Sequence, residues 1–119
     1  MEPHDRKRID KNMRIEIKPM SVNKAWQGKR FKTPAYKAYE KELMLKLKPM
    51  NIPDGNLYVY YEFGVTTLTD WDNPIKPFQD ILQKYYGFDD RRIMSAVVQK
   101  KVVKSGNEYI YFNIKELSK

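Results

Sequence analysis

The strongest constraint on the fold is a nine-residue alternation of side chains in the middle of the chain. Between residues 57 and 65 every odd position is apolar or aromatic, and positions 58, 60 and 62 carry tyrosine, tyrosine and glutamate. Successive side chains of an extended chain point to opposite faces, so the odd positions share one face. The segment therefore predicts a β-strand with one buried face, formed by Leu57, Val59, Tyr61, Phe63 and Val65.

A strand-to-helix junction is expected after this strand. Pro74 suits the first turn of a helix, where a missing N–H costs nothing, and Asn73 before it is a candidate N-cap. Asp70 and Asp72 stand at i and i+2, so at a strand end they would share a face. We expect a helix from Pro74 up to Gly87, a residue type that commonly ends helices. The expected core-facing stripe of this helix is Ile75, Phe78, Ile81, Leu82 and Tyr85.

The first half of the chain predicts a strand, a loop and a helix. Residues 14–18 alternate around two isoleucines and predict a short, half-buried strand. Residues 21–32 follow no period and predict a loop or a loose hairpin. Thr33 as N-cap and Pro34 at the first helical position predict a helix that ends before Pro49. Its expected apolar stripe is Tyr36, Tyr39, Leu43 and Leu47.

The last third predicts two strands, over residues 93–103 and 109–114, joined by a turn at 104–107 into a hairpin. The expected order is β-α-β-α-β-β, an α+β fold in which two helices cover a mixed sheet. The 119 residues fit a single domain, 1–119. Residues 1–12 show no periodicity and are expected to be a mobile tail.

The charge of the chain favours a polyanionic partner. There are 23 Lys and Arg against 15 Asp and Glu, a formal net charge of +8. Residues 54–90 hold seven acidic and two basic residues, a local net of −5, which leaves +13 on the remainder. A basic chain of this kind favours nucleic acid. An acidic island inside it either binds cations or consists of solvated charges clustered by chance.

Several classes of protein are excluded or disfavoured. The chain has no cysteine, which excludes disulfides and thiolate metal sites. Its one histidine, His4, lies in the expected tail, so mechanisms that need a histidine in the folded body are disfavoured. No apolar run approaches the ~20 residues of a membrane-spanning helix, and no signal peptide is recognisable. We therefore expect a cytoplasmic protein without a membrane partner.

The basic loop and the helix after it are expected to contact phosphates. Basic residues interleave there with Trp26 and Phe31, which either stack on unpaired bases or pack the loop against the core. From residue 24 to 48 the chain holds eight basic and two acidic residues, more than a solvated helix face requires. The expected DNA-binding residues are Lys24, Lys29, Arg30, Lys32 and Lys37.

The acidic island suits a hard divalent cation. Mg²⁺ usually takes one or two carboxylates together with water and substrate phosphate, and Asp70 and Asp72 would supply that pair. Asp90, or its neighbour Asp89, would supply a third ligand if the loop after the helix returned to the helix start. Lys76 would meet a phosphate and stabilise developing charge.

The role of Asp80 and the role of Asn73 complete this interpretation. Asp80 stands four residues after Lys76 and either orients the lysine or forms only a surface ion pair. Asn73 supports the site as the cap of the helix that carries Lys76.

Two central motifs carry a family resemblance: Asp70-x-Asp72-Asn73-x-x-Lys76 with Asp80, and Gly87-Phe88-Asp89-Asp90. They resemble the signature of the RusA family of Holliday junction resolvases. The upstream segment Ser21-Val22-Asn23-Lys24, the basic loop and Tyr36 on a helix are similar to that family's N-terminal half. The resemblance covers nearly the whole chain and is most specific in the centre.

The resemblance implies a small homodimeric endodeoxyribonuclease, often phage- or prophage-encoded. Such an enzyme binds four-way junction DNA in the cytoplasm of a bacterial host and makes paired nicks with Mg²⁺ or Mn²⁺ in DNA recombination and repair. By motif position, Asp70, Asp72 and Asp90 would be the metal-binding catalytic carboxylates and Lys76 the essential lysine. Trp71 stands where the family usually has an aliphatic residue, and we expect it to face away from the aspartates into the core.

Two other functions remain compatible with the sequence. One is a non-catalytic module that binds branched DNA or other nucleic acid, with aspartates that are purely structural. The other is a broader metal-dependent nuclease without preference for junctions. Cleavage of a four-way junction with and without Mg²⁺, compared with forked and linear DNA, separates the three.

Overall fold

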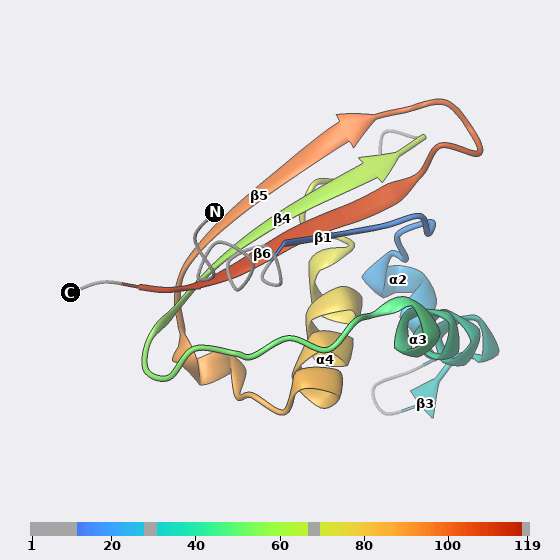
Figure 1. The fold of residues 1–119 in the computed structure, drawn as a ribbon. Helices are drawn as coiled ribbons and strands as arrows, with labels where there is room; N and C mark the ends of the chain where they lie inside the picture. The colour runs from blue at the N-terminus through green and yellow to red at the C-terminus, as the bar shows by residue number, and fades with distance from the viewer. Residues whose placement is uncertain (1–11, 28–30, 67–69, 118–119) are drawn as a thin grey trace.

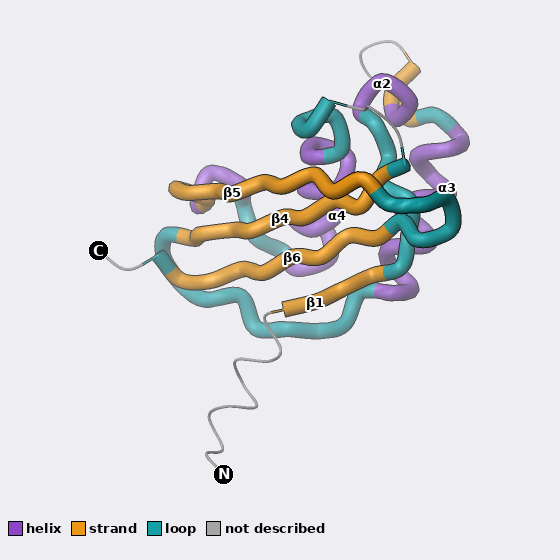
Figure 2. Tube along the Cα trace, turned by 90° about the horizontal axis from the view of Figure 1, so that it is seen from above, coloured by secondary structure: helices purple, strands orange, loops and turns teal. Residues whose placement is uncertain are grey.

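A four-stranded mixed sheet forms the centre of the computed structural model, which describes residues 12–27, 31–66 and 70–117. Its strand order is β1 (Asn12–Ile15), β6 (Tyr109–Glu116), β4 (Leu57–Val65) and β5 (Ile93–Val102). The pairs β1–β6 and β6–β4 are antiparallel, whereas β4–β5 is parallel. Figure 2 shows the four strands side by side, with the helices behind them. The expected α+β fold with a mixed sheet is confirmed.

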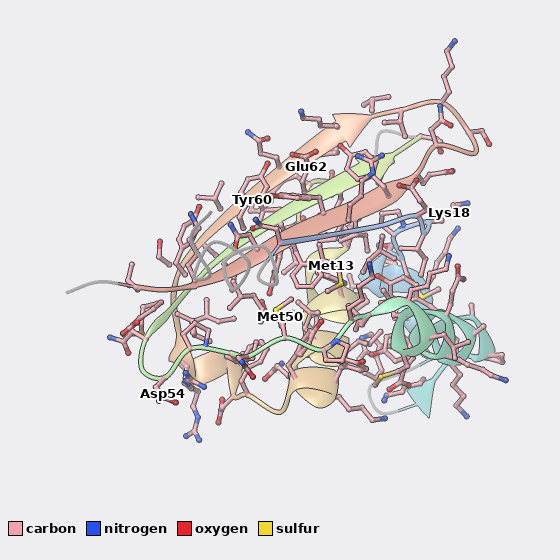
Figure 3. The ribbon with its side chains drawn as sticks, viewed as in Figure 1. Met13, Lys18, Met50, Asp54, Tyr60 and Glu62 are labelled. Atoms are coloured by element: carbon pink, nitrogen blue, oxygen red, sulfur yellow. The ribbon has the colours of Figure 1, made fainter. Side chains whose placement is uncertain are left out.

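The alternation of β4 is confirmed in full. All five odd-numbered side chains from Leu57 to Val65 are buried. Phe63 and Phe78 meet edge to face, with ring centroids 5.8 Å apart, where β4 packs on a helix. The even positions point to the opposite face, and Figure 3 shows Tyr60 and Glu62 there, away from the helices. Helices thus cover one face of the sheet only (Figure 1).

Two helices form this covering layer. Helix α3 (Pro34–Lys46) begins at Thr33, whose hydroxyl accepts a hydrogen bond from the Tyr36 N–H at 3.1 Å. Helix α4 (Ile75–Tyr86) ends at Gly87, which has φ 71° and whose N–H donates to the Gln83 carbonyl at 2.8 Å. A left-handed residue of this kind suits glycine because it has no Cβ. The expected stripe of α3 is buried: Tyr36, Tyr39, Leu43 and Leu47. In α4 the fully buried apolar residues of the stripe are Phe78, Ile81 and Leu82.

The predicted closing hairpin is wrong. β5 and β6 are consecutive in the chain, but β4 lies between them and pairs with both. The reason is the connection before β5. Helix α4 carries the chain back across one face of the sheet, so β5 runs parallel to β4 on one side, and β6 takes the other.

The N-terminal half differs from expectation in two places. The first strand is Asn12–Ile15 rather than 14–18, although Ile15 and Ile17, the two isoleucines of the expected strand, are both buried as expected. The expected loop at 21–32 contains a short helix, α2 (Val22–Ala25), and a two-stranded pair, β2 (Trp26–Gln27) with β3 (Phe31–Lys32). Ser21 caps α2 by accepting from the Asn23 N–H at 3.2 Å. The expected tail lies outside the described residues except for Asn12.

Candidate functional site

The two central aspartates lie in a turn and not on a strand end. β4 ends at Val65, and residues 67–69 lie outside the described part. The Asp70 carbonyl accepts from the Asn73 N–H at 3.1 Å, and the Asp72 carbonyl accepts from the Ile75 N–H at 3.1 Å. These bonds make 70–74 a turn that leads directly into α4. The expectation that Asp70 and Asp72 share a strand face is therefore wrong.

Asn73 is not the N-cap of α4. The helix begins at Ile75, and Pro74 takes the cap position without a side-chain hydrogen bond. Asn73 instead uses its backbone: its N–H closes the turn, and its carbonyl accepts from the Val22 N–H at 2.9 Å. That last bond fixes α2 to the turn that carries the two aspartates.

The turn presents its acidic side chains to solvent. Asp70 and Asp72 are exposed, and among the described residues neither carboxylate forms an ion pair or a side-chain hydrogen bond. Trp71 between them is 57% exposed, so the expectation that it packs into the core is wrong. In a turn the alternation of a strand does not apply, and nothing directs the indole inward. The arrangement leaves two carboxylates available to an external cation.

Lys76 lies one turn further, on the first turn of α4. Its Nζ is 3.2 Å from Oδ2 of Asp80, an i,i+4 ion pair. The other Asp80 oxygen lies 3.5 Å from Nε2 of Gln83. Asp80 is thus held on both sides, which suits an orienting partner, and the Lys76 side chain stays 63% exposed. The predicted contact between Lys76 and Asp80 is present.

Asp89 and Asp90 differ in how they are engaged. Asp89 caps the short 3₁₀ helix η1 (Asp90–Arg92) by accepting from the Arg91 N–H at 2.8 Å. It also pairs with the Arg91 guanidinium at 2.8 Å, and these hydrogen bonds lower the pKa of Asp89 to about 2. The Asp90 N–H donates to Oε1 of Gln83 at 2.8 Å, and the carboxyl group is exposed. Asp90 is therefore the freer of the two as a ligand.

The structure does not bring Asp90 to the central pair. Asp70 and Asp72 precede α4, and Asp90 follows it, so a helix of 12 residues separates them. At 1.5 Å per residue that helix is ~18 Å long. Figure 1 shows the yellow start and the orange end of α4 apart, and the hydrogen bond from the Asp90 N–H to Gln83 places Asp90 beside the last turns of the helix, near its orange end. Within residues 12–27, 31–66 and 70–117, no three His, Cys, Asp or Glu side chains group as a metal site.

A cavity of about 650 Å³ lies beside the acidic turn. Its walls come from the residues after β1, from α2, from one face of α3, from the end of β4 and from Asn73 and Pro74. Lys18, Asn23 and Tyr39 are on this wall. Sequence reasoning placed Tyr39 in the core and gave Lys18 no role, because a buried helical stripe carries no sign that a cavity adjoins it.

The expected phosphate-binding residues have different surroundings. Lys24 and Lys37 are exposed on α2 and α3. Lys32 lies 3.9 Å from a Glu40 oxygen and 5.1 Å from the centre of the Tyr36 ring. Lys29 and Arg30 lie outside the described residues.

Of the two aromatic residues of the basic segment, the structure describes the side chain of Trp26 only. Trp26 stacks on Tyr36 with ring centroids 5.5 Å apart, which favours packing over base stacking for this residue. The side chain of Phe31 is outside the described part.

No protein-family model matches the chain, and the comparison with curated proteins finds no match. No helix in the described part of the chain is long and apolar enough to cross a membrane. The chemistry of the site consists of two free carboxylates in a turn and a lysine that pairs with Asp80 on the first turn of the following helix.

Proposed function

We propose that the protein is a Mg²⁺-dependent endodeoxyribonuclease that cuts branched DNA, with a Holliday junction as its principal substrate. The observation that carries the proposal is the pair of exposed carboxylates, Asp70 and Asp72, followed by Lys76 with its partner Asp80. The net charge of +8 supports a DNA substrate. The resemblance of the central motifs to RusA resolvases supports the junction as the form of DNA.

The donor set of the turn fits Mg²⁺. This ion is commonly held by one or two carboxylates, with water and substrate phosphate completing an octahedral shell. Asp70 and Asp72 would hold it, and a bound ion would supply an activated water and stabilise the leaving oxygen. Mn²⁺ accepts the same ligands.

Lys76 performs a separate task in the proposed reaction. Its ammonium group lies on the first turn of α4 and is exposed, so it can contact the phosphate that is cut. Asp80 keeps the lysine near the helix surface and limits the conformations that it samples. A positioned cation at the developing negative charge lowers the barrier of phosphoryl transfer.

Asp90 is the proposed third ligand of the metal ion, although within one chain it lies away from Asp70 and Asp72. The two-fold symmetric nicks of a resolvase require a homodimer with two equivalent sites. If Asp90 is a ligand, either the loop after α4 moves or the second copy supplies the residue. Asp90→Asn should lose cleavage without losing stability if Asp90 is a ligand, because its side chain is exposed and its replacement leaves the folded structure intact.

The test is cleavage of a four-way junction with Mg²⁺ and with a chelator. Asp70→Asn and Asp72→Asn are expected to bind the junction and to lose cleavage by more than the ~10–100-fold that the loss of a residue orienting a metal ligand costs, because each variant removes a ligand itself. Asp54→Asn, an exposed aspartate in another turn, is the matched control and should cut normally. Full cleavage by either central variant would overturn the assignment of the site.

A non-catalytic DNA-binding module is the second candidate. The observation that favours it is the distance of Asp90 from the central pair. A module of this kind should bind junctions equally well with and without Mg²⁺ and should not cleave four-way, forked or linear DNA.

A further inference from the structure

A tryptophan is exposed between the two carboxylates of the acidic turn. The side chain of Trp71 is 57% exposed, whereas every other aromatic side chain of the described residues is buried or half-buried. No other aromatic ring in the described part of the chain contacts the indole. An indole in water forgoes the burial that would stabilise the fold, so it gains free energy when a partner covers its apolar face.

The turn fixes the position of Trp71 beside the proposed site. Trp71 is the second residue of the turn that the hydrogen bond from the Asn73 N–H to the Asp70 carbonyl closes at 3.1 Å. The turn leads into α4, whose Phe78 is fully buried, and the Asn73 carbonyl accepts from the Val22 N–H of α2. Consecutive Cα atoms are ~3.8 Å apart, so the indole originates within one residue of both carboxylates.

The charges around the indole narrow the choice of partner. A two-fold contact between copies through this turn would bring Asp70 and Asp72 of one copy against the same residues of the other, and these like charges repel. DNA bound through a cation meets the carboxylates when they are already neutralised. Lys76, whose side chain is 63% exposed, and Lys24, exposed on α2, can then contact adjoining phosphates.

Branched DNA presents the flat apolar face that an indole can cover. In a continuous duplex each base is covered on both faces by its neighbours in the stack. Where strands exchange at a branch point, that stack is interrupted. Aromatic side chains stack on uncovered bases, and apolar side chains insert at base steps that are opened.

We propose that Trp71 stacks on a base at the branch point of the DNA and thereby positions the neighbouring phosphate at Asp70 and Asp72. This inference rests on the proposed function. It concerns this chain in particular, because the aliphatic residue that RusA resolvases usually have at this place cannot stack in the same way. Trp71 is a positioning residue, since the indole takes no part in the bond that is cut.

The first test measures the fluorescence of the indole itself. The chain has two tryptophans, so Trp26→Phe leaves Trp71 as the only one. With a chelator present to prevent cleavage, a four-way junction should quench the emission of this variant. A linear duplex of the same base composition, at concentrations at which anisotropy shows it bound, should leave the emission nearly unchanged.

The control for this test is Trp71→Phe, which keeps only Trp26, the tryptophan that stacks on Tyr36. Its emission should not respond to the junction. Equal quenching of Trp71 by junction and duplex, or quenching by neither, would overturn the inference.

The second test separates stacking from apolar character. Trp71→Leu keeps an apolar side chain without a ring and should weaken junction binding by about 5- to 150-fold, the range for the loss of one stacked aromatic side chain. Trp71→Phe keeps a ring and should lose less. Leu45→Ala, at a side chain that is 79% exposed on α3, is the matched control and should bind normally. Wild-type affinity in Trp71→Leu would overturn the inference.

Dilution of the Trp26→Phe variant without DNA tests the competing partner, a second copy of the chain. The emission should stay constant. A change on dilution would place Trp71 in a contact between copies and would also overturn the inference.

The outcome is separable from that of the cleavage assay. A protein that cuts junctions, but in which Trp71→Leu binds them as the wild type does, keeps the proposed function and loses the stacking role of Trp71. A protein whose Trp71 emission is quenched by junctions only, but which never cuts DNA, keeps the stacking role and loses the nuclease assignment.

Discussion

At the scale of single residues, the outer face of the sheet contains a polar network centred on Glu62. Its carboxyl group accepts hydrogen bonds from the Tyr60 hydroxyl at 2.6 Å and from the Tyr109 hydroxyl. The Arg14 guanidinium lies 3.8 Å from the centre of the Tyr109 ring. Partial burial acts to raise the pKa of Glu62, but these two hydrogen bonds, with the charges of Lys101 and Arg14, outweigh it and lower the pKa.

This lowered pKa predicts a stability that depends on pH. A carboxyl group whose pKa falls on folding stabilises the protein above its unfolded pKa, near 4.5, and loses that effect as pH falls through the folded value. Glu62→Gln should lower the free energy of unfolding by about 1 kcal/mol at pH 7 and by much less at pH 3. Urea unfolding at both pH values measures this. Glu116→Gln, exposed at the end of β6, is the control, and an equal loss at both pH values for Glu62→Gln would contradict the prediction.

Gly64 allows Tyr109 to reach Glu62. A Cβ on Gly64 would lie 2.3 Å from Cε1 of Tyr109, so the ring would have to move from its place between Arg14 and Glu62. We expect Gly64→Ala to destabilise the fold by about 1–3 kcal/mol, the usual cost of overpacking. In a Tyr109→Ala background the same substitution should cost little. A double-mutant cycle in urea tests this, and additive losses would contradict it.

At the scale of elements, Thr33 couples two helices. Its hydroxyl accepts from the Tyr36 N–H as the cap of α3 and donates to the Lys24 carbonyl of α2 at 2.6 Å. Thr33→Ala loses both bonds and should lower the free energy of unfolding by about 1–2 kcal/mol. Thr33→Ser keeps the hydroxyl and should lose less than half as much. Thermal unfolding of the two variants measures the difference, and similar losses in both would show that the hydroxyl is not the cause.

Local patterns predicted the elements well where one face is buried against the core. The alternation of β4, the cap of α3 and the glycine at the end of α4 each follow from the residue type and its spacing. The parallel placement of β5 was missed, because hairpin and crossover connections have the same short-range signals around residues 104–107. Pairing partners depend on the path of the whole chain, which spacing along the sequence does not contain.

The candidate site was predictable in part for the same reason. The run from Asp70 to Lys76 is local, and the structure keeps its members together at the start of α4. The approach of Asp90 needed tertiary closure along a 12-residue helix, and the structure places Asp90 beside the last turns of that helix, at the end away from Asp70 and Asp72. The cavity at Tyr39 is formed by α2, α3 and the ends of two strands, so no single stretch of sequence indicates it.

At the scale of the whole molecule, the proposed function makes binding depend on salt. A protein that neutralises phosphates releases counterions, so the logarithm of its affinity falls linearly with the logarithm of salt concentration. Lys37 is exposed on α3 and has no ion pair in the described part of the chain. Lys32, in contrast, is within 3.9 Å of Glu40 and is already partly neutralised.

Lys37→Gln should therefore weaken binding to junctions of any base sequence. It should also reduce the magnitude of the slope of log affinity against log salt concentration by about 1. Lys32→Gln should reduce it by less, because its charge is shared with Glu40. Lys115→Gln is the control and should leave the slope unchanged, because Lys115 is exposed near the end of β6, and Figure 1 shows this end of the strand away from α3. Fluorescence anisotropy of a labelled four-way junction, from 50 to 200 mM salt, measures all three slopes. Equal reductions for Lys37 and Lys115 would mean that net charge alone, rather than the α3 surface, binds the phosphates.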